Sequence, residues 1–286
     1  MLIAASSSLL ALLDDTTLAA VVGGVSADCG DGDDGDGSGR ACGHASGSSR
    51  ESGEVSGSVH DERVTSASAP FQVRVLGPVA VLGPDGTWSE PPSVTQRRLV
   101  AALAVQAGRS IRADALGELL GLEPAALRKA VSRVRAVVGD ALSTSATGYR
   151  LDLGVDAHRF AQVVTAAVGG VDPAERAARL AAALGWWHGQ ALDEFAGESW
   201  AMAEAARLEQ LRSAAVDELA DCWIRSGRAT EALAALEPEV ARHPFADQPR
   251  ILQMRALAAS GRAADALRAA HRYRGELRDA VGVDPG

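Results

Sequence analysis

A segment that recurs after 34 residues is the feature that most restricts how this chain can fold. SGRATEAL occupies residues 226–233 and SGRAADAL occupies residues 260–267. This period is that of tetratricopeptide repeats, in which antiparallel helix pairs stack on their neighbours. The repeat predicts a tight corner at each glycine and a packed seam at each leucine, which are Gly227, Gly261, Leu233 and Leu267.

The repeat belongs to a longer segment, 156–286, whose pattern is helical almost throughout. A degenerate earlier unit runs from about His158 to Trp187 and turns near Asp172-Pro173. Large aromatic side chains in this segment either anchor the core or line a ligand groove, and we favour the core because such residues dominate burial energetics. They are Trp186, Trp187 and Trp200. Cys222 falls in a helical pattern and is expected to be a buried small apolar residue.

The preceding segment, 71–155, has a different periodicity. FQVRVLG from Phe71 alternates apolar and polar residues, and VAVLG and TWSE follow, which predicts a small antiparallel sheet. Amphipathic helices are expected over Ser93–Gly108 and Ala113–Leu122. A third helix and an alternating strand with its turn, GYRLDL from Gly148, complete the segment. A sheet, three helices and a terminal hairpin predict a winged helix-turn-helix. The expected fold class is therefore mainly α with a small β part, a winged helix followed by a tetratricopeptide-like α-helical domain.

The third helix, EPAALRKAVSRVRAVVG at 123–139, has two chemically opposite faces. Its apolar stripe consists of Leu127, Val131, Val134 and Val138. Its opposite arc consists of Arg128, Lys129, Ser132, Arg133 and Arg135. Taken alone, a basic helix is more often a solvated surface helix. As the third helix of a winged helix, it has the size and charge to enter a DNA major groove.

The net charge of −9 would disfavour a nucleic-acid partner if it were evenly spread, but it is not. Residues 1–70 contain 3 Arg and 11 Asp or Glu, residues 71–155 contain 10 cations and 7 acids, and residues 156–286 contain 15 cations and 19 acids. Only the middle segment is basic. A local DNA-binding patch is therefore compatible with an acidic chain.

Residues 1–70 are predicted to be a disordered low-complexity tail, because Gly, Ser and Asp leave little apolar surface to bury. Its first 24 residues are apolar, but they lack a positive start and are interrupted by Asp14-Asp15, which argues against a signal peptide. A further hypothesis is that translation starts at Val64. Three widely spaced cysteines fit a reducing interior, and the lack of a long apolar run indicates that no segment spans a membrane, so we expect a cytoplasmic protein without a membrane partner. Binding to DNA would make it nucleoid-associated.

No metal site, cofactor site or catalytic centre is expected. The calcium-loop-like stretch 34–39 has Ala45 where the twelfth ligand should be Glu. Paired metal-ligand spacing is also missing from Cys29, Cys42 and His44. The histidines of the helical segment have no nucleophile or metal partners at useful spacing: His158, His188, His243 and His271. The chain is therefore not expected to be an enzyme.

With both segments placed, the chain from Phe71 onward resembles the SARP family of actinobacterial regulators, which join an OmpR-like winged helix to a bacterial transcriptional activator domain. Five segments carry the resemblance in family order: FQVRVLGPVAV, TQRRLVAALAVQAGR, LRKAVSRVRAVVG with GYRL, ALGWWHGQALDEFAGESWAMAEAARLEQLR, and ELRDAVGVDP. The ATPase of larger relatives has no counterpart here.

The resemblance implies a sequence-specific DNA-binding activator of a secondary-metabolite (antibiotic) gene cluster. It also implies homo-oligomers on promoter direct repeats of double-stranded DNA, and recruitment of RNA polymerase holoenzyme. By position, the implied DNA-binding residues are Arg128, Lys129, Ser132, Arg133 and Arg135 in the recognition helix, Tyr149 and Arg150 in the wing, and Arg97 on a helix that flanks the backbone. We expect base contacts from Arg128, Lys129 and Ser132, and phosphate contacts from Arg133, Arg135 and Arg150.

The connection between the second and third helices departs from the family pattern. Only Gly121–Pro124 remains where relatives have a longer loop that is the expected polymerase contact, so activation through this loop is in doubt. The alternative function is a tetratricopeptide-like scaffold that binds a protein or ligand and has little specific DNA binding. Loss of sequence preference in Arg128→Ala would favour the regulator.

Overall fold

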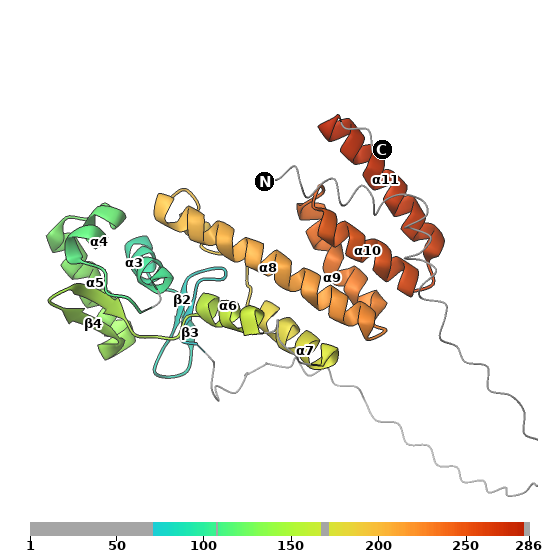
Figure 1. Ribbon diagram of the computed structural model, residues 1–286. Coiled ribbons are helices and arrows are strands. Elements are labelled where there is room, and N and C mark those ends of the chain that lie inside the picture. Colours follow the sequence, from blue (N-terminus) through green and yellow to red (C-terminus); the bar gives the residue numbers. More distant parts are fainter. Residues whose placement is uncertain (1–70, 107, 167–171, 283–286) are drawn as a thin grey trace, which may run out of the picture.

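The protein is mainly helical, with two small antiparallel sheets in its N-terminal part (Figure 1). The computed structural model describes residues 71–106, 108–166 and 172–282. The fold class expected from the sequence is confirmed. The predictions for residues 1–70, including the tail and the stretch around Cys29, Cys42 and His44, lie outside the described residues.

The first sheet contains three short strands in the order β1 (Val73–Arg74), β2 (Ala80–Leu82) and β3 (Trp88–Ser89). Neighbouring strands are antiparallel, as the alternating pattern predicts. Asp85 stabilises the β2–β3 turn, because its Oδ1 accepts hydrogen bonds from the Thr87 backbone N–H at 3.1 Å and from the Thr87 hydroxyl at 2.8 Å.

Three helices and a hairpin follow. They are α3 (Val94–Val105), α4 (Ala113–Leu120) and α5 (Pro124–Val138), and then β4 (Leu142–Ser145) paired antiparallel with β5 (Gly148–Leu151). The Ser93 hydroxyl caps α3 by accepting the Gln96 N–H at 3.3 Å, which is the stabilisation expected of serine at that position. The order of elements is that of a winged helix-turn-helix.

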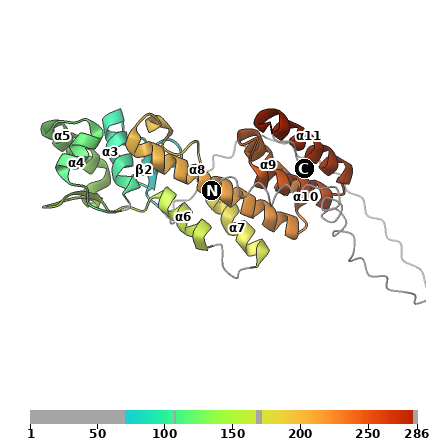
Figure 2. The ribbon, with the colours of Figure 1, turned by 45° about the horizontal axis from the view of Figure 1, so that its top comes forward.

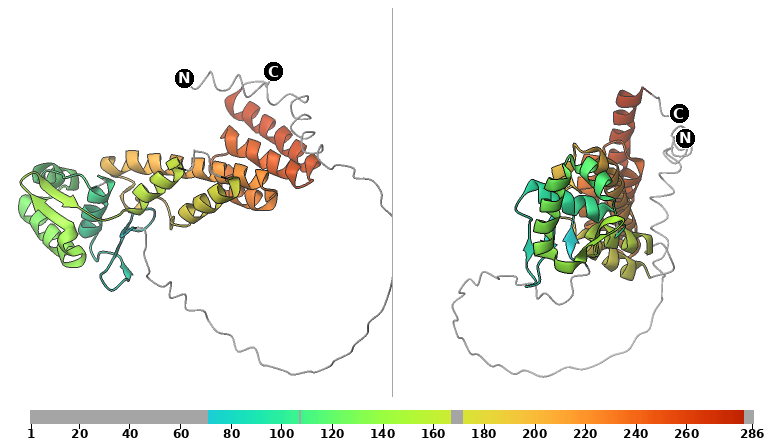
Figure 3. Two further views of the ribbon diagram at one scale, coloured as in Figure 1. Left: turned by 60° about the horizontal axis from the view of Figure 1, so that its bottom comes forward. Right: turned by 90° about the vertical axis from the view of Figure 1, so that its left-hand side faces the viewer.

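The rest of the described chain is helical. Its helices are α6 (Asp156–Ala166), α7 (Pro173–Leu184), α8 (Ser199–Arg225), α9 (Ala229–Arg242), α10 (Asp247–Ala259) and α11 (Ala263–Val281). The long helix α8 extends from the winged helix at one end to α9–α11 at the other, and α6 and α7 lie along it (Figures 1 and 2). The same arrangement is seen from below and along the long axis (Figure 3).

The 34-residue repeat gives two matching corners. Gly227 and Gly261 have φ of 73° and 76°, a left-handed conformation that glycine adopts without strain. Leu233, on α9, packs as a partly buried side chain against residues of α8, α10 and α11, as predicted. The prediction for Leu267 is wrong, because this side chain is 40% exposed. In the described part of the chain, no helix follows α11 and covers Leu267. The leucine of the second repeat therefore lacks the packing partners that the later helices provide for Leu233.

One continuous hydrophobic core runs from the sheet and α3–α5 into α6, α7 and α8. The three tryptophans support it. The ring centroids of Trp186 and Phe71 are 5.3 Å apart, and those of Trp187 and Phe160 are 5.4 Å apart. Trp200 is partly buried and packs against the same core. Cys222 is buried as well. The preference for core anchoring over a ligand groove agrees with these contacts.

Candidate nucleic-acid interface

Helix α5 is held by its apolar stripe, which leaves the opposite face free. Leu127, Val131 and Val134 are buried against α3 and α4, and Val138 is partly buried. Pro124 occupies the first turn, where its missing N–H costs no hydrogen bond, and Gly139 ends the helix with φ of 63°. The sequence therefore fixes both the length and the orientation of this helix.

The outward face of α5 is positively charged and uncompensated. Arg128, Lys129, Ser132 and Arg133 are all exposed. Residues 129 and 133 are one turn apart, as are residues 128 and 132, so the four side chains lie on adjacent rows of one face. No ion pair or side-chain hydrogen bond joins Arg128, Lys129 or Arg133 to any other residue that the structure describes. Most exposed arginines of the repeat domain, such as Arg179, Arg228 and Arg268, pair with a carboxylate, although Arg159 and Arg272 are exposed without an acidic partner among the described residues. The α5 face differs in carrying three such cations on adjacent turns of one helix.

The Arg135 side chain, unlike the other polar side chains on the outward face of α5, is hydrogen-bonded to residues that the structure describes. Its Nε donates a hydrogen bond to the Leu142 carbonyl at 3.0 Å, and its guanidinium also donates to the Thr144 hydroxyl at 2.7 Å. Arg135 thereby joins the end of α5 to β4 and is only partly exposed. The structure therefore places Arg135 between α5 and the β4–β5 hairpin.

The hairpin β4–β5 is docked on the loop before α4. The backbones of Ile111 and Tyr149 exchange two hydrogen bonds of 2.8 Å. Gly148 has φ of 132°, and a Cβ there would overlap the Ile111 carbonyl, so only glycine allows this approach. The Tyr149 side chain is 8% exposed and belongs to the core. Tyr149 therefore supports the wing from beneath, and its side chain is not on the outer surface.

Arg150 is the exposed cation of the wing. Its guanidinium pairs with Asp152, to which Nε donates at 2.6 Å, and both side chains are about half exposed. An exposed pair of this kind is weak, because water screens it and both side chains lose rotamer freedom. A phosphate can therefore replace the carboxylate as the partner of Arg150.

Arg97 does not lie with the other predicted residues. It forms a bidentate pair with Glu194, with Nε to Oε2 at 2.7 Å and a second nitrogen to Oε1 at 2.6 Å, and also donates to the Pro91 carbonyl. The neighbouring Arg98 pairs with Glu198 at 2.6 Å. These two arginines tie α3 to the segment that immediately precedes α8. Sequence reasoning could not find their partners, which lie about a hundred residues away.

The sequence analysis did not identify a group of hydroxyl side chains near the wing tip. Ser145 and Thr147 share a hydrogen bond of 2.7 Å, and Thr147 also contacts the Ser110 hydroxyl at 3.2 Å. They line a hollow with the start of α4, next to Arg112. Hydroxyls and arginines are common donors to phosphate oxygens. The signal that could have found them was the Ser/Thr-rich stretch before GYRL.

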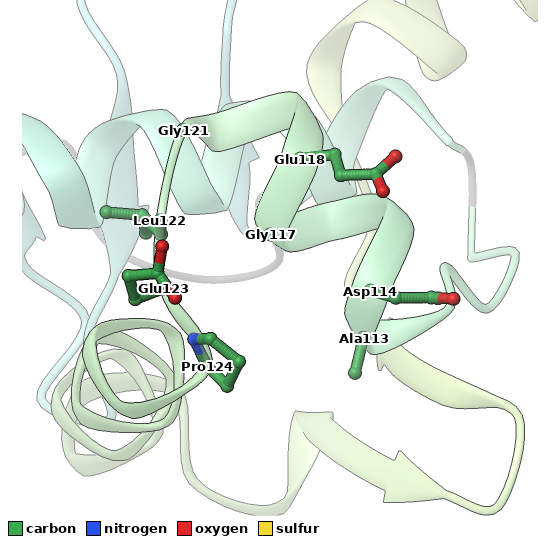
Figure 4. Close-up of a pocket in the computed structure, with 8 residues that line it drawn as sticks. All are labelled: Ala113, Asp114, Gly117, Glu118, Gly121, Leu122, Glu123 and Pro124. Carbon is green, nitrogen blue, oxygen red and sulfur yellow. The ribbon is translucent and has the colours of Figure 1, made fainter.

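A second, acidic hollow adjoins the first at the start of α4, where Ala113 and Asp114 line both. This hollow has a volume of about 490 Å³ and lies between α4 and the start of α5. Figure 4 shows the residues around it. Three of these residues carry carboxylates: Asp114, Glu118 and Glu123. The connection itself is tight, because Gly121 is left-handed and Leu122 N–H donates to the Gly117 carbonyl at 2.8 Å. Asp114 also lines the hollow at the wing tip and pairs there with Arg112.

Among the residues that the structure describes, no group of acidic, histidine and cysteine side chains is arranged to bind a metal. No helix in the same part of the chain combines the length and apolar character needed to cross a bilayer.

Comparison with known proteins gives one consistent result. Residues 155–286 match the family of bacterial transcriptional activator domains. The chain is 32% identical to the transcriptional regulator RedD of Streptomyces coelicolor over 80% of this chain and 71% of RedD. It is 31% identical to the regulatory protein DnrI of Streptomyces peucetius over 75% of this chain and 88% of DnrI. A solved structure of Mycobacterium tuberculosis EmbR, in complex with a low-affinity phosphopeptide, matches with a TM-score of 0.68 and 28% identity, over 76% of this chain and 62% of that one.

Proposed function

Since this chain belongs to the SARP family of transcriptional regulators, we propose that it regulates transcription by binding promoter DNA through α5 and the β4–β5 wing. The single observation that carries the proposal is the exposed, uncompensated cationic face of α5. A helix of this size fits the major groove, and cations without an internal partner are free to displace counterions from phosphates.

Individual residues have different proposed roles. Arg128, Lys129 and Ser132 lie nearer the start of α5 and are proposed to contact base edges, where bidentate arginine–guanine pairs give discrimination. Arg133 and Arg150 are proposed to contact phosphates, which set register and affinity. Arg135 is proposed to position the wing, because its guanidinium hydrogen-bonds β4.

The wider assignment follows the family. We propose that the chain divides into a tail at 1–70, a DNA-binding domain at 71–155 and an activator domain at 156–286. It would act in the cytoplasm as an activator of an antibiotic gene cluster, bind direct repeats as a homo-oligomer and recruit RNA polymerase holoenzyme. The short Gly121–Pro124 connection makes a polymerase contact elsewhere on the protein more favourable than one through this loop.

Genome-wide occupancy of the tagged protein, followed by footprinting of its strongest site, tests the proposal. We expect a footprint of spaced direct repeats upstream of a biosynthetic promoter, and its loss in Arg128→Ala. Arg272→Ala is the matched control, because Arg272 is an equally exposed cation on α11, far from α5 (Figure 1). A well-folded protein without specific occupancy would contradict the proposal and favour a scaffold that binds protein or ligand through its helical repeats.

A further inference from the structure

The cationic face of α5 has no partner within the described part of the chain. Arg128, Lys129 and Arg133 are exposed, and the carboxylates of the neighbouring hollow, which include Glu118, form no ion pair with them. A concentrated positive face of this kind attracts any flexible polyanion at low ionic strength, whether or not it is DNA.

The chain itself contains one. Residues 28–36, DCGDGDDGD, hold five aspartates in nine positions and no cation. The spacing of carboxylates along such a segment is comparable to that of phosphates along a nucleic-acid strand, and it carries no apolar side chain larger than cysteine. Blocks of like charge in a chain commonly serve as interaction segments. The most acidic run of the sequence and its most basic helix therefore occur in one polypeptide.

The distance between the two segments permits contact within one molecule. Asp36 and Phe71, the first described residue, are separated by 34 residues. That length of chain spans at most about 110 Å when extended, several times the roughly 30 Å width of a small domain. Tethering of this kind gives an effective concentration on the order of millimolar, well above that of a free competitor.

We propose that, in the absence of DNA, the acidic run 28–36 lies on the α5 face of its own chain and competes with DNA for Arg128, Lys129 and Arg133. The inference rests on the proposed function, since it concerns the same face. Non-specific binding depends almost wholly on charge, whereas a specific site adds base contacts that the aspartates cannot replace. The tail therefore suppresses non-specific binding more than specific binding and sharpens the preference for the operator.

A chemical peculiarity of the chain gives a direct test that needs no DNA. Lys129 is the only lysine in the sequence, so its Nζ is the only side-chain amine. A water-soluble carbodiimide joins an amine to a carboxylate in contact with it, and peptide mapping identifies the pair. We expect an amide between Lys129 and an aspartate of 28–36 in the full-length protein at low salt. Its yield should fall at high salt and when operator DNA is added.

Controls separate the possible failures of this test. Lys129→Arg keeps the charge but removes the amine, so the cross-link should disappear. Acylation of Lys129 by an N-hydroxysuccinimide ester, detected by peptide mapping, shows that the amine is reactive. If Lys129 is acylated but no tail cross-link forms, the proposal is overturned. Cross-links found only between two chains, with a yield that falls on dilution, also overturn it, because the occupant is then a second copy.

DNA binding supplies the second test. A full-length variant with all five aspartates changed to Asn (Asp28, Asp31, Asp33, Asp34 and Asp36) should bind random-sequence DNA about 3- to 10-fold more tightly at low salt, as expected for removal of a tethered weak competitor. The charge-matched control changes five dispersed acids of the same tail to their amides: Asp14, Asp15, Glu51, Glu54 and Asp61. We expect a gain of less than about twofold from it, because screening weakens charges that are not held on the face.

The outcomes distinguish this inference from the proposed function. Failure of the wild type and both variants to bind any DNA would reject the function, while the cross-link would still report on the tail. DNA binding with equal affinity in all three proteins would reject only the inference. Protein isolated from its native host without peptides before Val64 would also reject it, because the acidic run would then be missing.

Discussion

The carboxylate of Asp156 accepts the backbone N–H of Val75 at 2.9 and 3.1 Å, which joins the first residue of α6 to the end of β1. The same carboxylate accepts the N–H of Leu76 at 3.1 Å and of Ala157 at 2.7 Å. Asp156 is fully buried. Burial raises its pKa to about 6, although these donors and Arg74 act in the opposite direction. This contact lies where the winged helix meets the helical domain and joins the two through a buried carboxylate.

Asp156→Ala should destabilise the protein by about 2–4 kcal/mol, because it leaves buried N–H groups of Val75 and Leu76 without an acceptor. Urea unfolding monitored by circular dichroism measures the loss. Glu237→Ala, at an exposed position, is the control and should change stability by less than about 0.5 kcal/mol. Equal stability of the two variants would show that water replaces the carboxylate at this junction.

Asp217 should make stability depend on pH. Burial, and then the nearby carboxylate of Glu239, raise its pKa to about 6. Because this is above the value in the unfolded chain, the group favours folding at low pH, and its contribution is lost as pH rises through about 6. Asp217→Asn should therefore be more stable than wild type at pH 7.5, by about 1 kcal/mol after allowance for partial exposure, and no more stable at pH 4.5.

Thermal unfolding of wild type and Asp217→Asn between pH 4.5 and 8 checks this prediction. Comparing the two proteins isolates the group, because His158 and His188, whose pKa values are lowered by burial, affect both equally. A constant difference across the range would contradict the assignment.

Arg133→Ala should weaken DNA binding by a similar factor on all sequences. Each phosphate contact contributes about 0.9 to the slope of log affinity against log salt concentration, so the slope should fall by about that amount. A salt titration with operator and random DNA measures both effects. Arg272→Ala should leave the slope unchanged. A change of sequence preference in Arg133→Ala would instead assign Arg133 to base contacts.

Arg97→Ala should alter DNA affinity by less than about twofold, since its guanidinium is held by Glu194. Comparing the DNA affinity of Glu194→Ala with that of Arg97→Ala shows whether Arg97 contacts DNA. If Arg97 can reach a phosphate, releasing it from Glu194 should tighten binding, and Arg97→Ala should weaken it. If the pair is only a junction contact, both substitutions should lower stability by about 1 kcal/mol and leave the affinity unchanged.

Gly148→Ala should disrupt the docking of the wing. Its φ of 132° and the closeness of the Ile111 backbone leave no room for a Cβ, so we expect a loss of about 3 kcal/mol or more and weaker DNA binding. Gly275→Ala is the matched substitution. Gly275 lies within α11 with open space around it, and alanine there should stabilise the helix by about 0.5–1 kcal/mol. Similar unfolding midpoints for both variants would contradict the close approach.

Much of the candidate site could be predicted from the sequence, because the determinants of α5 are local. Its apolar stripe recurs at helical spacing, so the stripe determines which face is buried and leaves Arg128, Lys129 and Arg133 on the other face. The glycine corners at 227 and 261 follow from the repeat in the same way. What the sequence could not supply was the surroundings of single residues.

By itself, then, the amino-acid sequence determined the helices, the strands, their order and the charge carried by each face, since these depend on periodicity and on neighbours a few positions away. Tertiary structure alone decided that Tyr149 is buried beneath the wing, that Arg97 meets Glu194, that Asp156 holds Val75, and that Leu267 lacks a covering helix. These contacts join residues far apart in the chain, or depend on whether another element packs there. Such distances are set by the packing of the whole core, and no local pattern encodes them.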